Sequence, residues 1–221
     1  MKRALPIFDV PAGASEAVAI QKTLRDRVVR TGSVKPRLVA GVDVSYKDEV
    51  ARAVIVLLNG LELVEKVVVE EEIRFPYIPG LLSFREIPPL LSAWRKIRTR
   101  PDVVIVDGHG VAHPRRFGVA SHFGVLLDLP TVGCAKSLLC GEYDEPAKKR
   151  GSWSPLVHRE ETVGAALRTR DGCNVVYVST GHRISLRSAI SVVLACATRY
   201  RLPEPQRLAD HLTRQKAADG V

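Results

Sequence analysis

The sequence predicts an α/β fold, a mixed β-sheet flanked by helices on both faces. Three observations lead to it: strand-like runs follow one another closely over residues 37–72, residues 103–106 are wholly apolar, and segments of helical length separate the later strand-like runs. With 221 residues, 46% of them apolar, the chain can build one sizeable core. We therefore expect a single domain spanning residues 1–221.

The first third of the chain predicts a helix followed by an antiparallel meander. Apolar residues recur at helical spacing from Ser15 to about Val29, and Gly32-Ser33 should end that helix. Asn59-Gly60 separates two β-branched runs, and both residues tolerate the positive φ of a tight hairpin turn. The expected strands are residues 37–46, 52–58 and 61–72.

The remaining elements alternate between strands and helices. A proline-rich loop over residues 75–80 should lead into a helix from Leu81 to about Ile97, interrupted or restarted at Pro88-Pro89. The expected later elements are a buried strand at 103–106, a helix at 114–127, a strand at 130–134, a hairpin between 157 and 168, a strand at 175–179 and a helix at 185–200 with Ser185 as N-cap. This order is that of the RNase H-like fold.

Charge and composition narrow the class of partner. The chain has 33 Lys+Arg against 24 Asp+Glu, a formal net charge of +9, which favours a polyanionic partner over a surface charged only for solubility. No window is long and apolar enough to span a membrane, and Met1 to Pro11 lacks a signal-peptide core, so we expect a cytoplasmic protein without a membrane partner. The four cysteines have no CxxC spacing and predict reduced thiols.

Two aspartates are the first candidates for chemistry. Asp43 lies inside the apolar run 38–46, where an unpaired carboxylate would be costly, although a half-exposed edge strand would accommodate it. Asp107 ends the buried strand 103–106 and precedes Gly108-His109-Gly110; it is placed where α/β sheets form sites, or it caps the turn. If the first and fourth strands are neighbours, the two carboxylates can meet and bind Mg²⁺ or Mn²⁺.

Three further side chains are candidates with an alternative each. Glu86 follows Arg85 on the predicted helix and is either a third acidic group or half of a solvated ion pair. His113 could contact phosphate or move a proton, or it could be a packed loop residue. Lys136, just past a strand, could offset the charge of an attacked phosphate, or it could be an ordinary surface lysine.

The segment Pro76-Tyr77-Ile78-Pro79 predicts a stiff projection. Two prolines restrict the backbone on either side of an aromatic and an aliphatic side chain. Stiff apolar tips of this kind push between stacked bases, whereas the alternative is a turn whose Tyr77 packs back on the core.

Five segments, taken together and in order, closely resemble the endonuclease V family: residues 41–46, 76–86, 107–115, 133–138 and 200–205. The resemblance runs from about Gly41 to Asp210. It implies an RNase H-like, metal-dependent endonuclease that recognises inosine or deoxyinosine and cleaves the second phosphodiester bond 3′ to the lesion, leaving 3′-hydroxyl and 5′-phosphate ends, in DNA repair.

The resemblance also implies roles for individual residues. Asp43, Glu86 and Asp107 match metal-binding carboxylates, and Tyr77 matches the wedge aromatic of a loop in which Pro76, Ile78 and Pro79 take part. The residues matching positions near the scissile phosphate and lesion pocket are His113 and Lys136, with Gly108 close to a flipped base. Asp210, with His211 in reserve, is the late position near the metal.

The implied cofactor is Mg²⁺, with Mn²⁺ also supporting activity, and the implied partner is DNA containing deoxyinosine or RNA containing inosine, bound by a monomer. Two other readings remain: an inactive nucleic-acid-binding module on the same fold, and another RNase H-like nuclease such as a junction resolvase or a ribonuclease. The acidic residues argue against the first, and the Pro-Tyr-Ile-Pro loop argues against the second.

Overall fold

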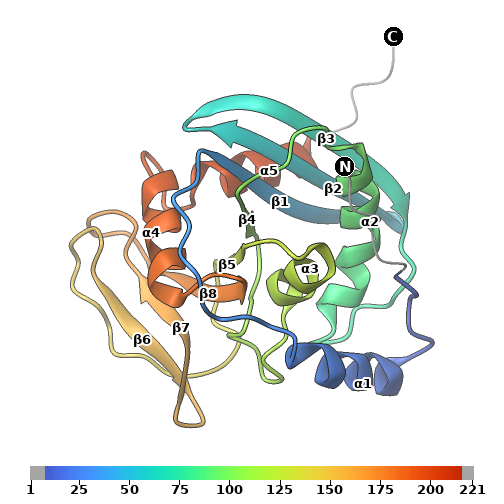
Figure 1. The fold of residues 1–221 in the computed structure, drawn as a ribbon, viewed down its shortest axis with the longest axis horizontal. Helices are drawn as coiled ribbons and strands as arrows, with labels where there is room; N and C mark the ends of the chain where they lie inside the picture. The colour runs from blue at the N-terminus through green and yellow to red at the C-terminus, as the bar shows by residue number, and fades with distance from the viewer. Residues whose placement is uncertain (1–7, 216–221) are drawn as a thin grey trace.

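A computed structural model describes residues 8–215 and contains one eight-stranded mixed sheet, ordered β3-β2-β1-β4-β5-β8-β7-β6 (Figure 1). The elements are α1 (Ala14–Arg25), β1 (Leu38–Lys47), β2 (Val50–Asn59), β3 (Glu62–Glu72), α2 (Leu82–Lys96), β4 (Val103–Val106), α3 (Val119–Leu127), β5 (Thr131–Ala135), β6 (Trp153–His158), β7 (Glu161–Leu167), β8 (Val176–His182), α4 (Leu186–Cys196) and α5 (Glu204–Arg214).

The centre of the sheet is parallel and its two sides are antiparallel. β1 runs antiparallel to β2 and parallel to β4, with Val42 opposite Val106. β4 is parallel to β5, and β8 returns antiparallel beside β5. The predicted meander is confirmed, and the first and fourth strands are neighbours as the aspartate hypothesis required.

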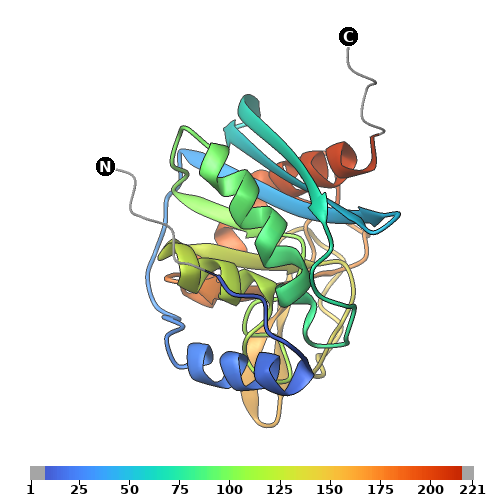
Figure 2. The same ribbon diagram turned by 90° about the vertical axis from the view of Figure 1, so that its right-hand side faces the viewer.

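Helices cover both faces of this sheet. Because side chains alternate along a strand, Val104 packs with α2 and α3 while its neighbours Val103 and Ile105 pack with α4. α5 lies against the β2 side chains Val54, Val56 and Leu58. Figures 1 and 2 place α1 at the edge of the molecule, beside α3. This arrangement confirms the predicted fold class.

Several predicted boundaries are wrong for local reasons. The first helix ends at Arg25, because the carbonyls of Val29 and Gly32 instead accept hydrogen bonds from the backbone N–H groups of Arg183 and Ser185, beside the start of α4. The turn between β2 and β3 is formed by Gly60 and Leu61, not by Asn59-Gly60 as predicted. Asn59 is the last residue of β2, and a register shift between Leu57 and Leu58 moves the turn by one residue.

The predicted helices also differ in extent. α2 runs without a break through Pro88 and Pro89, because its buried face packs on β2 and β3 and outweighs the lost hydrogen bonds. α3 begins at Val119, since Arg116 takes a left-handed conformation that no helix accommodates. α4 ends at Cys196, where the Arg150 guanidinium donates to the carbonyls of Leu194 and Ala197.

α5 is a helix that sequence reasoning missed. The signals were present: a glutamate and a proline at its start, and apolar residues at helical spacing further on. Ser185 does cap α4, accepting a hydrogen bond from the N–H of Ser188. The four cysteines are free, and no helix within residues 8–215 is long and apolar enough to cross a membrane. Residues 1–7 of the N-terminal stretch considered above lie outside the described residues.

Candidate active site

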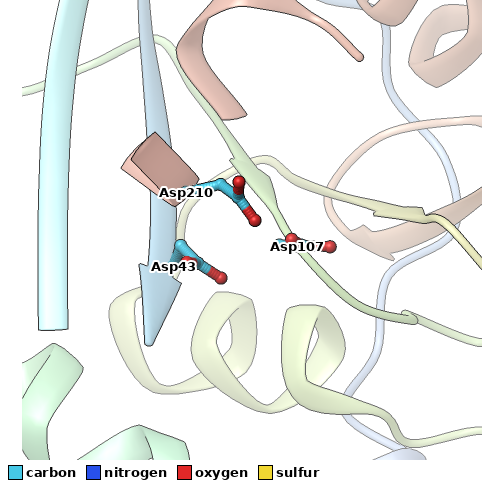
Figure 3. A group of neighbouring side chains, drawn as sticks. All are labelled: Asp43, Asp107 and Asp210. Atoms are coloured by element: carbon cyan, nitrogen blue, oxygen red, sulfur yellow. The ribbon is translucent and has the colours of Figure 1, made fainter. Parts of the chain in front are cut away.

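Three aspartates converge beside the carboxyl end of β4. Asp43 comes from β1, Asp107 directly follows β4, and Asp210 comes from α5; one carboxylate oxygen of each lies within 4.8 Å of the others (Figure 3). All three are partly shielded from solvent. Carboxylate oxygens grouped in this way suit Mg²⁺ or Mn²⁺.

Backbone geometry brings these residues together. The N–H of Asp107 donates to the carbonyl of Val42, which places the end of β4 beside Asp43. α5 approaches β1 so closely that a Cβ at Gly41 would lie 2.1 Å from the carbonyl oxygen of Pro205. Gly41 is therefore what allows α5 to carry Asp210 into the site.

The charges of the three aspartates are unequally balanced. Burial raises the pKa of Asp43, and the nearby Asp107 and Asp210 add to that rise against the Thr213 hydroxyl, which donates to Asp43 at 2.7 Å. At Asp210 burial also acts to raise the pKa, but Lys136 and Arg214 outweigh it and the net shift is downward. Asp43 is thus the member of the group that most lacks a compensating cation.

Lys136 bridges two of the three aspartates. Its Nζ donates to Asp107 Oδ2 and to Asp210 Oδ1, each at 2.6 Å. Burial lowers its pKa, but the two hydrogen-bonded carboxylates outweigh burial and raise it. The alternative of an ordinary surface lysine is wrong, because this ammonium is tied to two of the three aspartates.

Glu86 adds a fourth carboxylate from α2. It lies outside the group of three, yet it is almost fully buried, and burial together with the charges of Asp43 and Asp107 raises its pKa. Its expected partner Arg85 instead lies over the Tyr46 ring at 4.4 Å and donates to the carbonyl of Phe75. The solvated ion pair considered for Glu86 is therefore wrong.

His113 is packed against the proline-rich loop and is not a member of the acidic group. Its Nε2 donates to the carbonyl of Gly80 at 3.0 Å, and its Nδ1 accepts from the N–H of Arg115 at 3.1 Å. Burial, followed by the charge of Arg115, lowers its pKa to about 4, so the ring is neutral at pH 7. The structure favours the packed-residue alternative over proton transfer.

The carbonyl of Gly80 collects two more donors, which sequence reasoning missed. Arg115 Nη2 reaches it at 2.6 Å and Gln21 Nε2 at 3.0 Å, and the fully buried Gln21 also bonds the carbonyl of Phe117. Gly80 itself has φ +77. A glutamine on the inner face of an amphipathic helix was the available signal for this anchor.

Tyr77 projects from the anchored loop with 67% of its surface exposed. Ile78 packs partly against the cluster of Phe75, Leu81 and Phe84, while Pro76 and Pro79 are exposed. The packed-turn alternative for Tyr77 is wrong. The loop holds an aromatic side chain outward on a fixed base.

The remaining candidates are placed as follows. Gly108 has φ +158, and a Cβ there would lie 2.5 Å from Val119, so the turn after Asp107 requires a glycine. Of the two late positions, Asp210 joins the acidic group, whereas His211 is exposed and bonds Gln215. Thr213, which fixes Asp43, was missed because nothing in its local sequence links it to β1.

Comparison with known proteins identifies the family. The profile of the Endonuclease V family matches residues 22–211. Endonuclease V of Roseiflexus sp. (strain RS-1) is 53% identical over 205 residues, covering 91% of this chain and 92% of that protein. Endonuclease V of Trichormus variabilis is 50% identical over 208 residues, covering 91% and 94%.

Solved structures agree. Endonuclease V from Streptomyces avermitilis superimposes with a TM-score of 0.89 at 45% identity, covering 93% of each chain. Endonuclease V of Ciona intestinalis, solved with a 24mer DNA containing an inosine followed by a ribo-adenosine, has a TM-score of 0.80 at 31% identity, covering 90% of this chain and 95% of that one. The protein described here therefore belongs to the endonuclease V family.

Proposed function

We propose that this endonuclease recognises inosine or deoxyinosine in nucleic acid and hydrolyses the second phosphodiester bond on its 3′ side. The observation that carries the proposal is the pairing of an acidic group at the central strands β1 and β4 with an exposed aromatic on an anchored loop. The Ciona intestinalis structure with inosine-containing DNA, which shares this fold, supports the choice of lesion. Repair of deaminated adenine follows from such an activity.

The acidic group fits a divalent cation, for which we propose Mg²⁺, with Mn²⁺ as a substitute. Asp43, Asp107 and Asp210 would hold it, and the buried carboxyl group of Glu86 lies near them. When bound, such an ion supplies positive charge to the phosphate oxygens and activates water.

The protein's own residues then orient the reaction. Thr213 fixes one oxygen of Asp43, so that the carboxylate keeps its direction. Lys136 bonds Asp107 and Asp210; with a cation held by these carboxylates, its ammonium would be free to offset the negative charge of the attacked phosphate or its leaving oxygen. We assign His113 a positioning role at Gly80, in place of proton transfer.

Lesion recognition is assigned to the loop and its neighbours. Tyr77, supported by Pro76, Ile78 and Pro79, would fill the space that the damaged base leaves in the stack. The flipped base would then lie near the half-buried Gly108. Because a single eight-stranded sheet carries the site, we propose that residues 1–221 act as one nuclease domain, and we propose that it works as a monomer.

The central experiment compares matched oligonucleotides. Duplex DNA, single-stranded DNA and RNA carrying one inosine, or adenine at the same place, are incubated with Mg²⁺, Mn²⁺ or EDTA, and the ends of the products are mapped. We expect cutting two bonds 3′ of inosine, loss of cutting in EDTA, and loss in Asp43→Ala and Asp107→Ala but not in Asp26→Ala, a change at an exposed helix end. Equal cutting of the adenine controls would refute the lesion assignment; the RNA arm decides between a DNA repair enzyme and an inosine-specific endoribonuclease.

The wedge has its own test. Tyr77→Ala should lose stacking of ~1 to 3 kcal/mol, lowering the ratio of inosine to control binding in Ca²⁺ while leaving affinity for undamaged strands nearly unchanged. Tyr200→Ala, which removes another exposed tyrosine, is the matched control. An unchanged ratio in Tyr77→Ala would refute the wedge role.

A further inference from the structure

A polar cavity of about 240 Å³ adjoins the acidic group on the β5 and β8 side. It is lined by Lys136, just past β5, and by Tyr177, whose backbone pairs with Ala135 at the end of β5. It is smaller than the roughly 300 to 1,000 Å³ of pockets that enclose drug-sized ligands. Its size suits one group of a larger ligand, and we name it the Arg201 cavity after one of its two lining arginines.

The three cations that line the Arg201 cavity are not equivalent. Lys136 is committed to Asp107 and Asp210, and the almost fully buried Arg168 is ion-paired with Glu145, the one carboxylate among the residues that line the cavity. Arg201 donates only to the backbone carbonyl of Lys136, at 3.4 Å, and within residues 8–215 no carboxylate pairs with it. Arg201 is therefore the lining cation whose charge is still available to a ligand.

The neutral groups of the cavity are hydrogen-bond donors. Asn174 is exposed and, among the described residues, its side-chain amide has no hydrogen-bond partner. The hydroxyls of Tyr143 and Tyr177 bond each other at 3.2 Å. Burial raises the pKa of Tyr177 to about 12, so that hydroxyl keeps its proton at pH 7. A free guanidinium beside an amide and phenol hydroxyls is a set of donors suited to a phosphate oxygen.

We propose that the Arg201 cavity binds a backbone phosphate of the substrate strand on the 3′ side of the cut, through Arg201 and Asn174. The proposal rests on the proposed function, which places the lesion 5′ of the cut. The loop carrying Tyr77 leads into α2, which packs on β2 and β3; the carboxylates lie at β1 and β4, and the cavity lies at β5 and β8. A strand that passes from the lesion loop over the carboxylates therefore reaches the cavity with its 3′ part.

The test pairs one arginine with one phosphate. Inosine-containing oligonucleotides carry a single uncharged methylphosphonate at successive positions on both sides of the cut, and their binding is titrated in Ca²⁺ with wild type, Arg201→Ala and Arg199→Ala. Arg199 is exposed and does not line the cavity, so it matches the change in net charge. We expect Arg201→Ala to weaken binding of the normal oligonucleotide about tenfold, and to reduce the salt dependence of binding by about one released cation.

The decisive result is non-additivity. At one phosphate 3′ of the cut, the methylphosphonate should weaken wild-type binding about tenfold but leave Arg201→Ala unchanged, whereas in Arg199→Ala its full effect should remain. Arg201→Lys should bind more tightly than Arg201→Ala, because it keeps the positive charge. Asn174→Asp should bind the normal oligonucleotide more weakly than wild type, because it adds negative charge beside the same phosphate.

Two failures are distinguishable. If wild type prefers inosine but the effects of Arg201→Ala and the methylphosphonates add at every position, or if the coupled phosphate lies 5′ of the cut, the cavity assignment is refuted and the proposed function stands. If wild type shows no preference for inosine, the proposed function fails. Should Arg201→Ala melt abnormally, Asn174→Asp and the salt dependence of Arg201→Lys decide the question.

Discussion

Replacing Lys136 by methionine tests the idea that its ammonium substitutes for a metal ion. The change keeps the length and most of the apolar stem of the side chain but removes the charge that bonds Asp107 and Asp210. We expect Lys136→Met to be less stable than wild type without metal, to bind Mg²⁺ more tightly, and to cleave poorly.

The magnitude follows from the distances. Two carboxylate oxygens within 4.8 Å of each other repel by at least about 3.5 kcal/mol at an effective dielectric constant of 20, which gives at least about 10 kcal/mol for the three pairs. The Lys136 ammonium lies 2.6 Å from an oxygen of Asp107 and from an oxygen of Asp210. At the same dielectric constant, each contact gives an attraction of about 6 kcal/mol. Its two contacts together give about 12 kcal/mol, so its attraction is of the same size as the repulsion among the three carboxylates.

The loss of unfolding free energy in Lys136→Met is smaller than these electrostatic sums. The carboxylates can hydrate or take up a proton when the lysine is removed, and the Lys136 side chain is 33% exposed. Breaking a fully buried ion pair costs about 3 to 5 kcal/mol, so we expect about 2 kcal/mol here. For a chain of this length that lowers Tm by about 4 to 8 °C.

The assay is thermal unfolding of wild type, Lys136→Met and Lys22→Met, in EDTA and across a Mg²⁺ titration. Lys22 is an exposed lysine of α1 and serves as the control for lost charge. The difference between wild type and Lys136→Met should narrow as Mg²⁺ rises, because the ion replaces the missing charge and no longer competes with an ammonium. A Tm difference that is equal in EDTA and in saturating Mg²⁺, or weaker Mg²⁺ binding by the variant, would refute the reasoning.

Two further predictions concern buried titratable groups. Burial and the neighbouring Asp43 and Asp107 disfavour the charged form of Glu86, so Glu86→Gln should raise the free energy of unfolding in EDTA by about 1 to 3 kcal/mol while reducing Mg²⁺-dependent cleavage; destabilisation in EDTA would contradict this. Burial lowers the pKa of His122 to about 3, so its neutral form stabilises the fold fully above the unfolded pKa of about 6.5, and this contribution is lost as pH falls towards 3. Between pH 7 and 5, denaturant unfolding should show wild type losing up to about 2 kcal/mol more than His122→Leu, and equal losses would contradict the assignment.

The sequence by itself determined the architecture and two of the aspartates. Strand periodicity and the closely spaced runs over residues 37–72 predicted the meander, because a half-buried sheet imposes a period of two on its side chains. An apolar run of four residues predicted the central strand β4, since a strand covered on both faces has no polar side. Asp43 and Asp107 were recognisable for the converse reason: each carboxylate interrupts or ends an apolar run, where its desolvation needs a partner.

Tertiary structure alone decided what surrounds those aspartates. The resemblance had named Asp210 with His211 in reserve, and packing decides for Asp210. Thr213, which sequence reasoning missed, also comes from α5, 170 residues after Asp43, and the approach of α5 depends on Gly41 lacking a Cβ. The partners of Lys136 and His113 likewise come from distant segments. Local sequence reports the period and polarity of a segment, but hydrogen bonds and charges act over a few ångströms in space, so their partners are set by packing between segments that the sequence separates.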